Sequence, residues 1–120
     1  MDKKILIVDD AAFMRKLIAR TLAEFGYTEV CEAEDGIAAC AQYAKFNPDL
    51  VIMDITMPNM SGIEALNEIK HADPNAKVIM CSAMGQESMV MEAIKIGAVD
   101  FVVKPFKPER LISAVENVWN

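Results

Sequence analysis

The stretch that decides the fold is Leu50-Val51-Ile52-Met53-Asp54, in which four consecutive apolar residues end at a carboxylate. An unbroken apolar run of this length is typical of a strand that is buried on both faces, as in the middle of a parallel sheet. The loop that follows, residues 56–62, contains proline, asparagine and glycine, which end a strand. Asp54 is therefore predicted to lie at the carboxyl edge of a sheet, where open α/β folds place their chemistry.

The same pattern of strand and helix recurs along the whole chain. Further strands are predicted at residues 5–8, 29–33, 78–81 and 101–103. Between and after the strands, apolar residues recur at helical spacing, which predicts helices that begin near residues 13, 35, 61, 86 and 108. Strict alternation of strand and helix predicts an α/β fold, a five-stranded parallel sheet with helices on both faces.

Composition limits the class of protein. The chain has 120 residues, which suits one domain, and 53% of them are hydrophobic, which argues against disorder. The net charge of −6 disfavours nucleic acid or an anionic membrane as a direct partner. No apolar run approaches the ~18 residues that a membrane span needs. The three cysteines, Cys31, Cys40 and Cys81, lie among apolar residues and indicate a reducing compartment, so we expect a soluble cytoplasmic protein.

Four of the five predicted strands end in polar or charged residues, namely Asp9-Asp10, Asp54, Ser82 and Lys104. In a parallel sheet these strand ends meet at one edge. Two like charges ~4 Å apart repel by about 4 kcal/mol at an effective dielectric near 20, so three carboxylates need either a proton or a divalent cation. Mg²⁺ prefers such oxygen ligands, and a lysine and a hydroxyl suit phosphoryl oxygens. The set predicts phosphoryl transfer to a carboxylate, in a chain without a G-x-x-x-x-G-K-[ST] loop.

The motifs at these strand ends resemble those of response-regulator receiver domains. They are Leu6-Ile7-Val8-Asp9-Asp10, Met53-Asp54-Ile55-Thr56-Met57-Pro58, Ser82-Ala83 and Val103-Lys104-Pro105-Phe106. The resemblance covers the whole chain and is nearest to the single-domain members that act in chemotaxis. It implies a flavodoxin-like (βα)5 fold with strand order 2-1-3-4-5, an order known for this fold class. It also implies one receiver domain over residues 1–120 with no output domain, acting as a monomer.

The resemblance implies a role for each acidic residue. Asp54 matches the residue that accepts a phosphoryl group from a phosphohistidine on a histidine kinase. Asp9 and Asp10 match the acidic pair that binds Mg²⁺ together with Asp54 and the backbone carbonyl of Thr56. The cofactor expected from the resemblance is therefore Mg²⁺.

Three further residues match positions that respond to the phosphoryl group. Lys104 matches the lysine that contacts it, and Ser82 matches the switch hydroxyl. Phe101 matches the switch aromatic, where some chemotaxis members have tyrosine. The partners implied are a chemotaxis histidine kinase, the flagellar motor switch protein and a phosphatase, and the bond before Pro105 is expected to be cis.

Two other functions remain open from the residues. An aspartyl-phosphate phosphohydrolase also uses an aspartate at a strand end with Mg²⁺, but it needs a second acid two residues later, where this chain has Thr56. A receiver-shaped adaptor that works without phosphorylation would not need the complete acidic set. We therefore expect a signalling protein whose only catalysis is its own phosphoryl transfer and dephosphorylation.

The helix predicted from about residue 86 offers a candidate partner surface. Val90, Ala93 and Ile94 are predicted to be its buried face, and Met89, Met91 and Ile96 fall outside that face. Flexible methionines framed by charge suit a surface that repacks against more than one partner. Scattered exposed apolar residues are also normal, so this pattern alone leaves both interpretations open.

Overall fold

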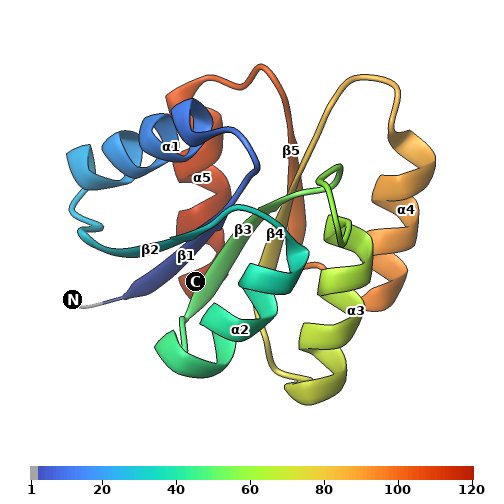
Figure 1. Ribbon diagram of the computed structural model, residues 1–120. Helices are drawn as coiled ribbons and strands as arrows, with labels where there is room; N and C mark the ends of the chain where they lie inside the picture. The colour runs from blue at the N-terminus through green and yellow to red at the C-terminus, as the bar shows by residue number, and fades with distance from the viewer. Residues whose placement is uncertain (1–2) are drawn as a thin grey trace.

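The computed structural model describes residues 3–120 and has five strands and five helices in strict alternation (Figure 1). The strands are β1 (Lys4–Val8), β2 (Glu29–Ala33), β3 (Leu50–Asp54), β4 (Val78–Ser82) and β5 (Asp100–Val103). The helices are α1 (Ala12–Glu24), α2 (Gly36–Phe46), α3 (Gly62–Ala72), α4 (Glu87–Ile96) and α5 (Pro108–Trp119). None of the described helices is long and apolar enough to cross a membrane.

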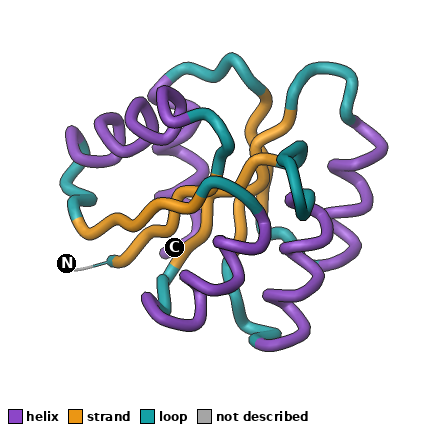
Figure 2. The backbone as a smooth tube through the Cα atoms, viewed as in Figure 1, coloured by secondary structure: helices purple, strands orange, loops and turns teal. Residues whose placement is uncertain are grey.

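All strand pairs are parallel, and the sheet order is β2-β1-β3-β4-β5. The predicted α/β fold and its strand order 2-1-3-4-5 are therefore confirmed. Helices α1 and α5 cover one face of the sheet, and α2, α3 and α4 cover the other (Figure 1). Because every strand runs the same way, the loops that follow the strands gather along one edge (Figure 2).

The unbroken apolar strands are buried because alternate residues enter two different cores. In β3, Val51 and Met53 pack beneath α2, α3 and α4, whereas Leu50 and Ile52 pack beneath α1 and α5. All four side chains are at most 1% exposed. The sequence pattern that predicted a doubly covered strand therefore reflects two hydrophobic cores on opposite faces of one sheet.

The helix starts follow from local hydrogen bonds that the sequence predicts in part. Asp35 caps α2 by accepting a hydrogen bond from the Ala38 N–H at 2.8 Å. Ser61 and Glu64 form a capping box at the start of α3. Helix α4, like α1 and α5, has no such cap, because the side chain of its N-cap residue Gln86 makes no capping hydrogen bond.

The buried face of α4 differs from the prediction. Val90 and Ala93 are buried as expected, but Ile94 is 43% exposed. Ile96, expected outside the buried face, is half-buried and packs against the core shared with α3. Residues of α3 belong to that core, whereas Ile94 lines a groove beside β5, where the sheet ends.

Candidate functional site

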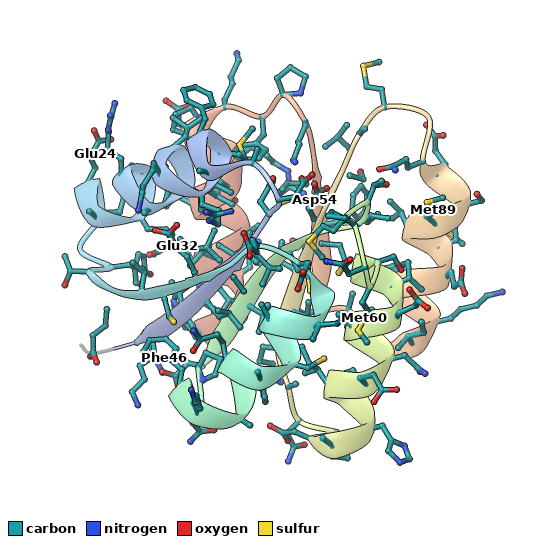
Figure 3. The ribbon with its side chains drawn as sticks, viewed as in Figure 1. Glu24, Glu32, Phe46, Asp54, Met60 and Met89 are labelled. Atoms are coloured by element: carbon teal, nitrogen blue, oxygen red, sulfur yellow. The ribbon has the colours of Figure 1, made fainter. Side chains whose placement is uncertain are left out.

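Three carboxylates meet at the carboxyl edge of the sheet. Asp9 and Asp10 directly follow β1, and Asp54 is the last residue of the neighbouring strand β3 (Figure 3). One carboxylate oxygen from each residue lies within 4.8 Å of the others. We call these three carboxylates the acidic group. Asp9 is buried and Asp10 is exposed, so the acidic group is enclosed by protein on one side and open to solvent on the other.

Lys104 reaches the acidic group from the end of β5. Its Nζ lies 2.8 Å from Asp9 Oδ2 and 3.1 Å from Asp54 Oδ2. The Lys104 N–H donates to the carbonyl of Ser82 at 2.7 Å, which fixes the end of β5 against the end of β4. The Lys104–Pro105 peptide bond is cis, as the sequence resemblance implied.

The charges of these residues perturb one another. Burial raises the pKa of Asp54, the nearby Asp9 charge adds to the rise, and Lys104 opposes it. Burial alone would lower the pKa of Lys104, but its hydrogen bond to Asp9 and the charges of Asp54 and Asp9 raise it. The group thus has three carboxylates and one ammonium, which pairs with two of them, and the excess of negative charge favours an additional cation.

Asp9 is held by contacts that the sequence reasoning missed. Its Oδ1 accepts the Ala11 N–H at 2.9 Å, and its backbone carbonyl accepts Arg15 Nη1 at 2.7 Å. Arg15 in turn pairs with Glu32 on β2 at 2.9 Å. Arg15 looks like an ordinary helix residue in the sequence, and only its place in the first turn of α1, close to the end of β1, points to this contact.

Gly62 is a second residue that the sequence reasoning placed only in a loop. A Cβ at Gly62 would lie 2.0 Å from the backbone oxygen of Asp54, a distance that no side chain tolerates. The Gly62 N–H donates to the carbonyl of Ile55 at 2.7 Å. The first residue of α3 therefore packs directly behind Asp54, and only glycine allows this approach.

The two predicted switch residues lie on the neighbouring strands β4 and β5, outside the acidic group. Ser82 is buried at the end of β4, and Phe101 is half-buried on β5. Within residues 3–120, no side-chain hydrogen bond joins Ser82 or Phe101 to the three carboxylates. Both line a largely apolar groove of about 350 Å³ between β5 and α4, together with Met91 and Ile94.

The donor set suits a hard divalent cation. The acidic group supplies three carboxylate oxygens, which is the ligand chemistry that Mg²⁺ prefers. The exposed side at Asp10 leaves room for water and for a further oxygen ligand, as Mg²⁺ sites normally require. The residues present therefore fit the expected ion.

Comparison with known proteins identifies the family. The model of the response regulator receiver domain matches residues 5–116. The chain is a response regulator receiver domain. Chemotaxis protein CheY of Bacillus subtilis is 55% identical over 120 residues, and the match covers 100% of both chains. CheY of Thermotoga maritima is 54% identical over 118 residues, covering 98% of each.

Solved structures agree with this assignment to the receiver family. CheY in the CheX–CheY–BeF3–Mg²⁺ complex of Borrelia burgdorferi superposes with a TM-score of 0.93 at 38% identity, covering 98% of this chain and 90% of that chain. The receiver domain of NtrX from Brucella abortus gives a TM-score of 0.90 at 38% identity, covering 95% and 96%. The chain is thus a two-component signalling domain closely related to the chemotaxis CheY proteins.

Proposed function

We propose that this receiver domain is a phosphorylation-activated switch in which Asp54 accepts a phosphoryl group from a histidine kinase. The observation that carries the proposal is the position of Asp54 within 4.8 Å of two further carboxylates and 3.1 Å from Lys104 Nζ. The carboxylates alone would repel an incoming phosphoryl dianion. Lys104 and a cation bound by the carboxylates would neutralise its charge. The kinship with CheY supports a role in chemotaxis.

In this proposal the acidic group binds Mg²⁺. Asp9, Asp10, Asp54 and the backbone carbonyl of Thr56 would hold the ion, which supplies positive charge next to the reacting oxygens. Lys104 supplies a second positive charge from the opposite side and binds an oxygen of the transferred group. Arg15 keeps the Asp9 backbone in place through its hydrogen bond.

The transfer itself needs one bond to form and one to break. A carboxylate oxygen of Asp54 forms a bond to phosphorus, and the P–N bond to the donor histidine breaks with its electron pair left on the imidazole nitrogen. The product is an acyl phosphate on Asp54. Burial favours the reaction, because a carboxylate with a raised pKa is less well solvated and more nucleophilic.

We further propose that Ser82 and Phe101 transmit the change to a partner surface on α4 and β5. Ser82 ends the strand beside Asp54, and Phe101 lines the groove next to exposed Met91 and Ile94. Met89 lies on another side of α4, close to the loop after Asp54, so the expected methionine surface is divided between two grooves (Figure 3). Ile96 is not part of this surface, because it packs against the core.

The partners proposed from the kinship are a chemotaxis histidine kinase as donor and a flagellar motor switch protein as target. A phosphatase is a further candidate from the family resemblance, and a CheY relative at 38% identity does form a complex with a second protein, CheX. The α4–β5 groove, with its apolar lining, is the surface on which we expect the target to bind.

Intact mass after incubation with acetyl phosphate tests the proposal. We expect one phosphoryl group per chain in the presence of Mg²⁺ and none in excess chelator, because the acidic group repels the donor when no cation is bound. Asp54→Asn should remain unmodified in both conditions. Modification of Asp54→Asn, or uptake by the wild type in chelator, would contradict the assignment of Asp54 and Mg²⁺.

A further inference from the structure

The side chain of Gln86, the residue just before α4, does not cap the helix. Its backbone carbonyl accepts the Val90 N–H at 3.0 Å, as the N-cap residue of α4 should. N-cap residues are usually Ser, Thr, Asp or Asn, whose short side chains bond to the first turn of the helix. The Gln86 side chain makes no such bond and is directed back towards the sheet edge.

Gln86 instead connects the two loops that flank Asp54. Its Oε1 accepts the Ala83 N–H at 2.7 Å, and its Nε2 donates to Thr56 Oγ1 at 2.8 Å. Thr56 lies two residues after Asp54, and Ala83 is the first residue after β4. Among residues 3–120, the bond to Thr56 is the one side-chain hydrogen bond that joins these two loops, and the bond to Ala83 holds the Gln86 side chain in place. We call this pair of bonds the Gln86 latch.

The Ala83 N–H points towards the strand that carries Asp54. In a parallel sheet, successive residues of a strand bond alternately to the two neighbouring strands. The Cys81 carbonyl accepts Ile55 N–H on the β3 side at 3.1 Å, and the Ser82 carbonyl accepts Lys104 N–H on the β5 side at 2.7 Å. The next residue, Ala83, therefore directs its N–H to the β3 side, where the strand ends at Asp54.

We propose that Gln86 is a positioning residue that competes with the phosphoryl group for the Ala83 N–H. This inference rests on the proposed function of Asp54 as phosphoryl acceptor. A charged phosphoryl oxygen is a stronger acceptor than the neutral amide oxygen of Gln86, so loading of Asp54 displaces Gln86 from Ala83. The displacement opens the latch and frees the N-terminus of α4, which links Asp54 to the helix that lines the α4–β5 groove.

The latch makes loading slower than it would be without Gln86. With acetyl phosphate as donor, an Asp54 oxygen bonds to phosphorus while the bond between phosphorus and the acetate oxygen breaks, and acetate leaves with that electron pair. The Ala83 N–H can bind the transferred group only after leaving Gln86. Removing the Gln86 side chain removes the competing acceptor, and the loss of one ordinary hydrogen bond changes a rate by about two- to tenfold.

The test compares Gln86→Ala with Gln42→Ala, which replaces the only other glutamine of the chain. Gln42 lies on α2, remote from the two loops of the latch. With acetyl phosphate and Mg²⁺, intact mass should show Gln86→Ala loading about two- to tenfold faster than the wild type. Gln42→Ala should load at the wild-type rate. Gln86→Glu keeps an acceptor for Ala83 and adds negative charge, so it should load more slowly than the wild type.

A spectroscopic measurement separates competition from a merely structural role. In 15N-labelled protein without phosphoryl donor, the Ala83 amide should exchange with solvent faster in Gln86→Ala than in the wild type. After loading, the Ala83 amide resonances of the two proteins should converge, because both then bond to the phosphoryl group. Convergence with faster loading supports the latch.

Two results would overturn the inference. A Gln86→Ala protein that loads at or below the wild-type rate, while the wild type loads normally, refutes the latch and leaves the proposed function intact. Ala83 resonances that remain different after loading also refute it. A wild type that takes up no phosphoryl group refutes the proposed function, and the latch fails with it.

Discussion

The loops on either side of Asp54 differ in how firmly they are held. The β3–α3 loop, residues 55–61, is tied to its surroundings at several points. Met60 accepts the Gly36 N–H at 3.1 Å, and Asn59 donates to the Asp35 carboxylate at 2.8 Å. Behind it, Gly62 packs against the backbone of Asp54. This loop therefore has no room to move without breaking contacts with α2 and α3.

The β4–α4 loop, residues 83–86, has few such contacts. Ala83, Met84 and Gly85 are exposed, and Met84 is 80% exposed. A Cβ at Gly85 would have no atom within 4 Å. The hydrogen bonds of Gln86 are the side-chain contacts that hold this loop within the described chain. A group bound to Asp54 thus lies between one loop that is fixed and one that is free to respond.

The largest expected effect is on stability, and it comes from substituting one glycine at each of the two loops. Gly62→Ala should lower the free energy of unfolding by roughly 3 kcal/mol or more, because the new methyl group collides with backbone that cannot move. Gly85→Ala should cost only about 1 kcal/mol, since its φ of +90° is unfavourable for alanine but the space is open. Urea unfolding measures both, and equal losses would contradict the difference between the loops.

Most of this site could be predicted because it follows from the sheet. Asp9, Asp54 and Lys104 converge because parallel strands end at one edge, and apolar runs in the sequence reveal those strands. The direction of the Gln86 side chain could not be predicted, since periodicity locates a helix start without saying which loop its side chain meets. Ile94 was placed wrongly for a related reason. The helical pattern does not show that the sheet ends at β5 and leaves that side of α4 uncovered.

A smaller effect on stability is expected from removing the charge of Asp54, which lies between the two loops. Burial and the Asp9 charge raise the pKa of Asp54, so its ionised form destabilises the fold. Asp54→Asn should therefore stabilise the protein at pH 7 without metal, on the order of 1 kcal/mol. Because the pKa of Asp54 is higher in the folded protein, its carboxyl group contributes most to stability below the unfolded pKa, and this contribution is lost as the pH rises. The difference in stability between Asp54→Asn and the wild type should accordingly shrink as the pH falls towards 4.

Magnesium provides the control for this prediction. The cation should raise the melting temperature of the wild type, because it binds the folded acidic group and not the unfolded chain. It should raise that of Asp54→Asn less. If Asp54→Asn is less stable than the wild type at pH 7, or gains as much from Mg²⁺, the carboxylates do not repel one another as described.

The smallest expected effect is a change in the pKa of Asp35 when its contact with the β3–α3 loop is removed. Asn59 has a φ of +69°, so Asn59→Gly removes its hydrogen bond to Asp35 without adding backbone strain. The Ala38 N–H and then Asn59 lower the pKa of Asp35, and NMR titration should find that pKa closer to its ordinary value in the variant. Because the pKa of Asp35 is lower in the folded than in the unfolded protein, its carboxylate stabilises the fold above the unfolded pKa. This stabilisation is lost as the pH falls through the folded pKa. The variant should therefore be slightly less sensitive to acid, and an unchanged Asp35 pKa would contradict the contact.

The most direct test of the account is to record amide resonances of both loops while Asp54 is loaded with acetyl phosphate and Mg²⁺. The account predicts large shifts at Ala83, whose N–H gains a bond to the phosphoryl group, and at Gln86, whose side chain loses its bond to Ala83. It predicts continuing changes into the first turn of α4. It predicts smaller shifts from Asn59 to Gly62, because those backbone contacts remain in place. Equal or larger shifts from Asn59 to Gly62, with Ala83 and Gln86 unmoved, would contradict it.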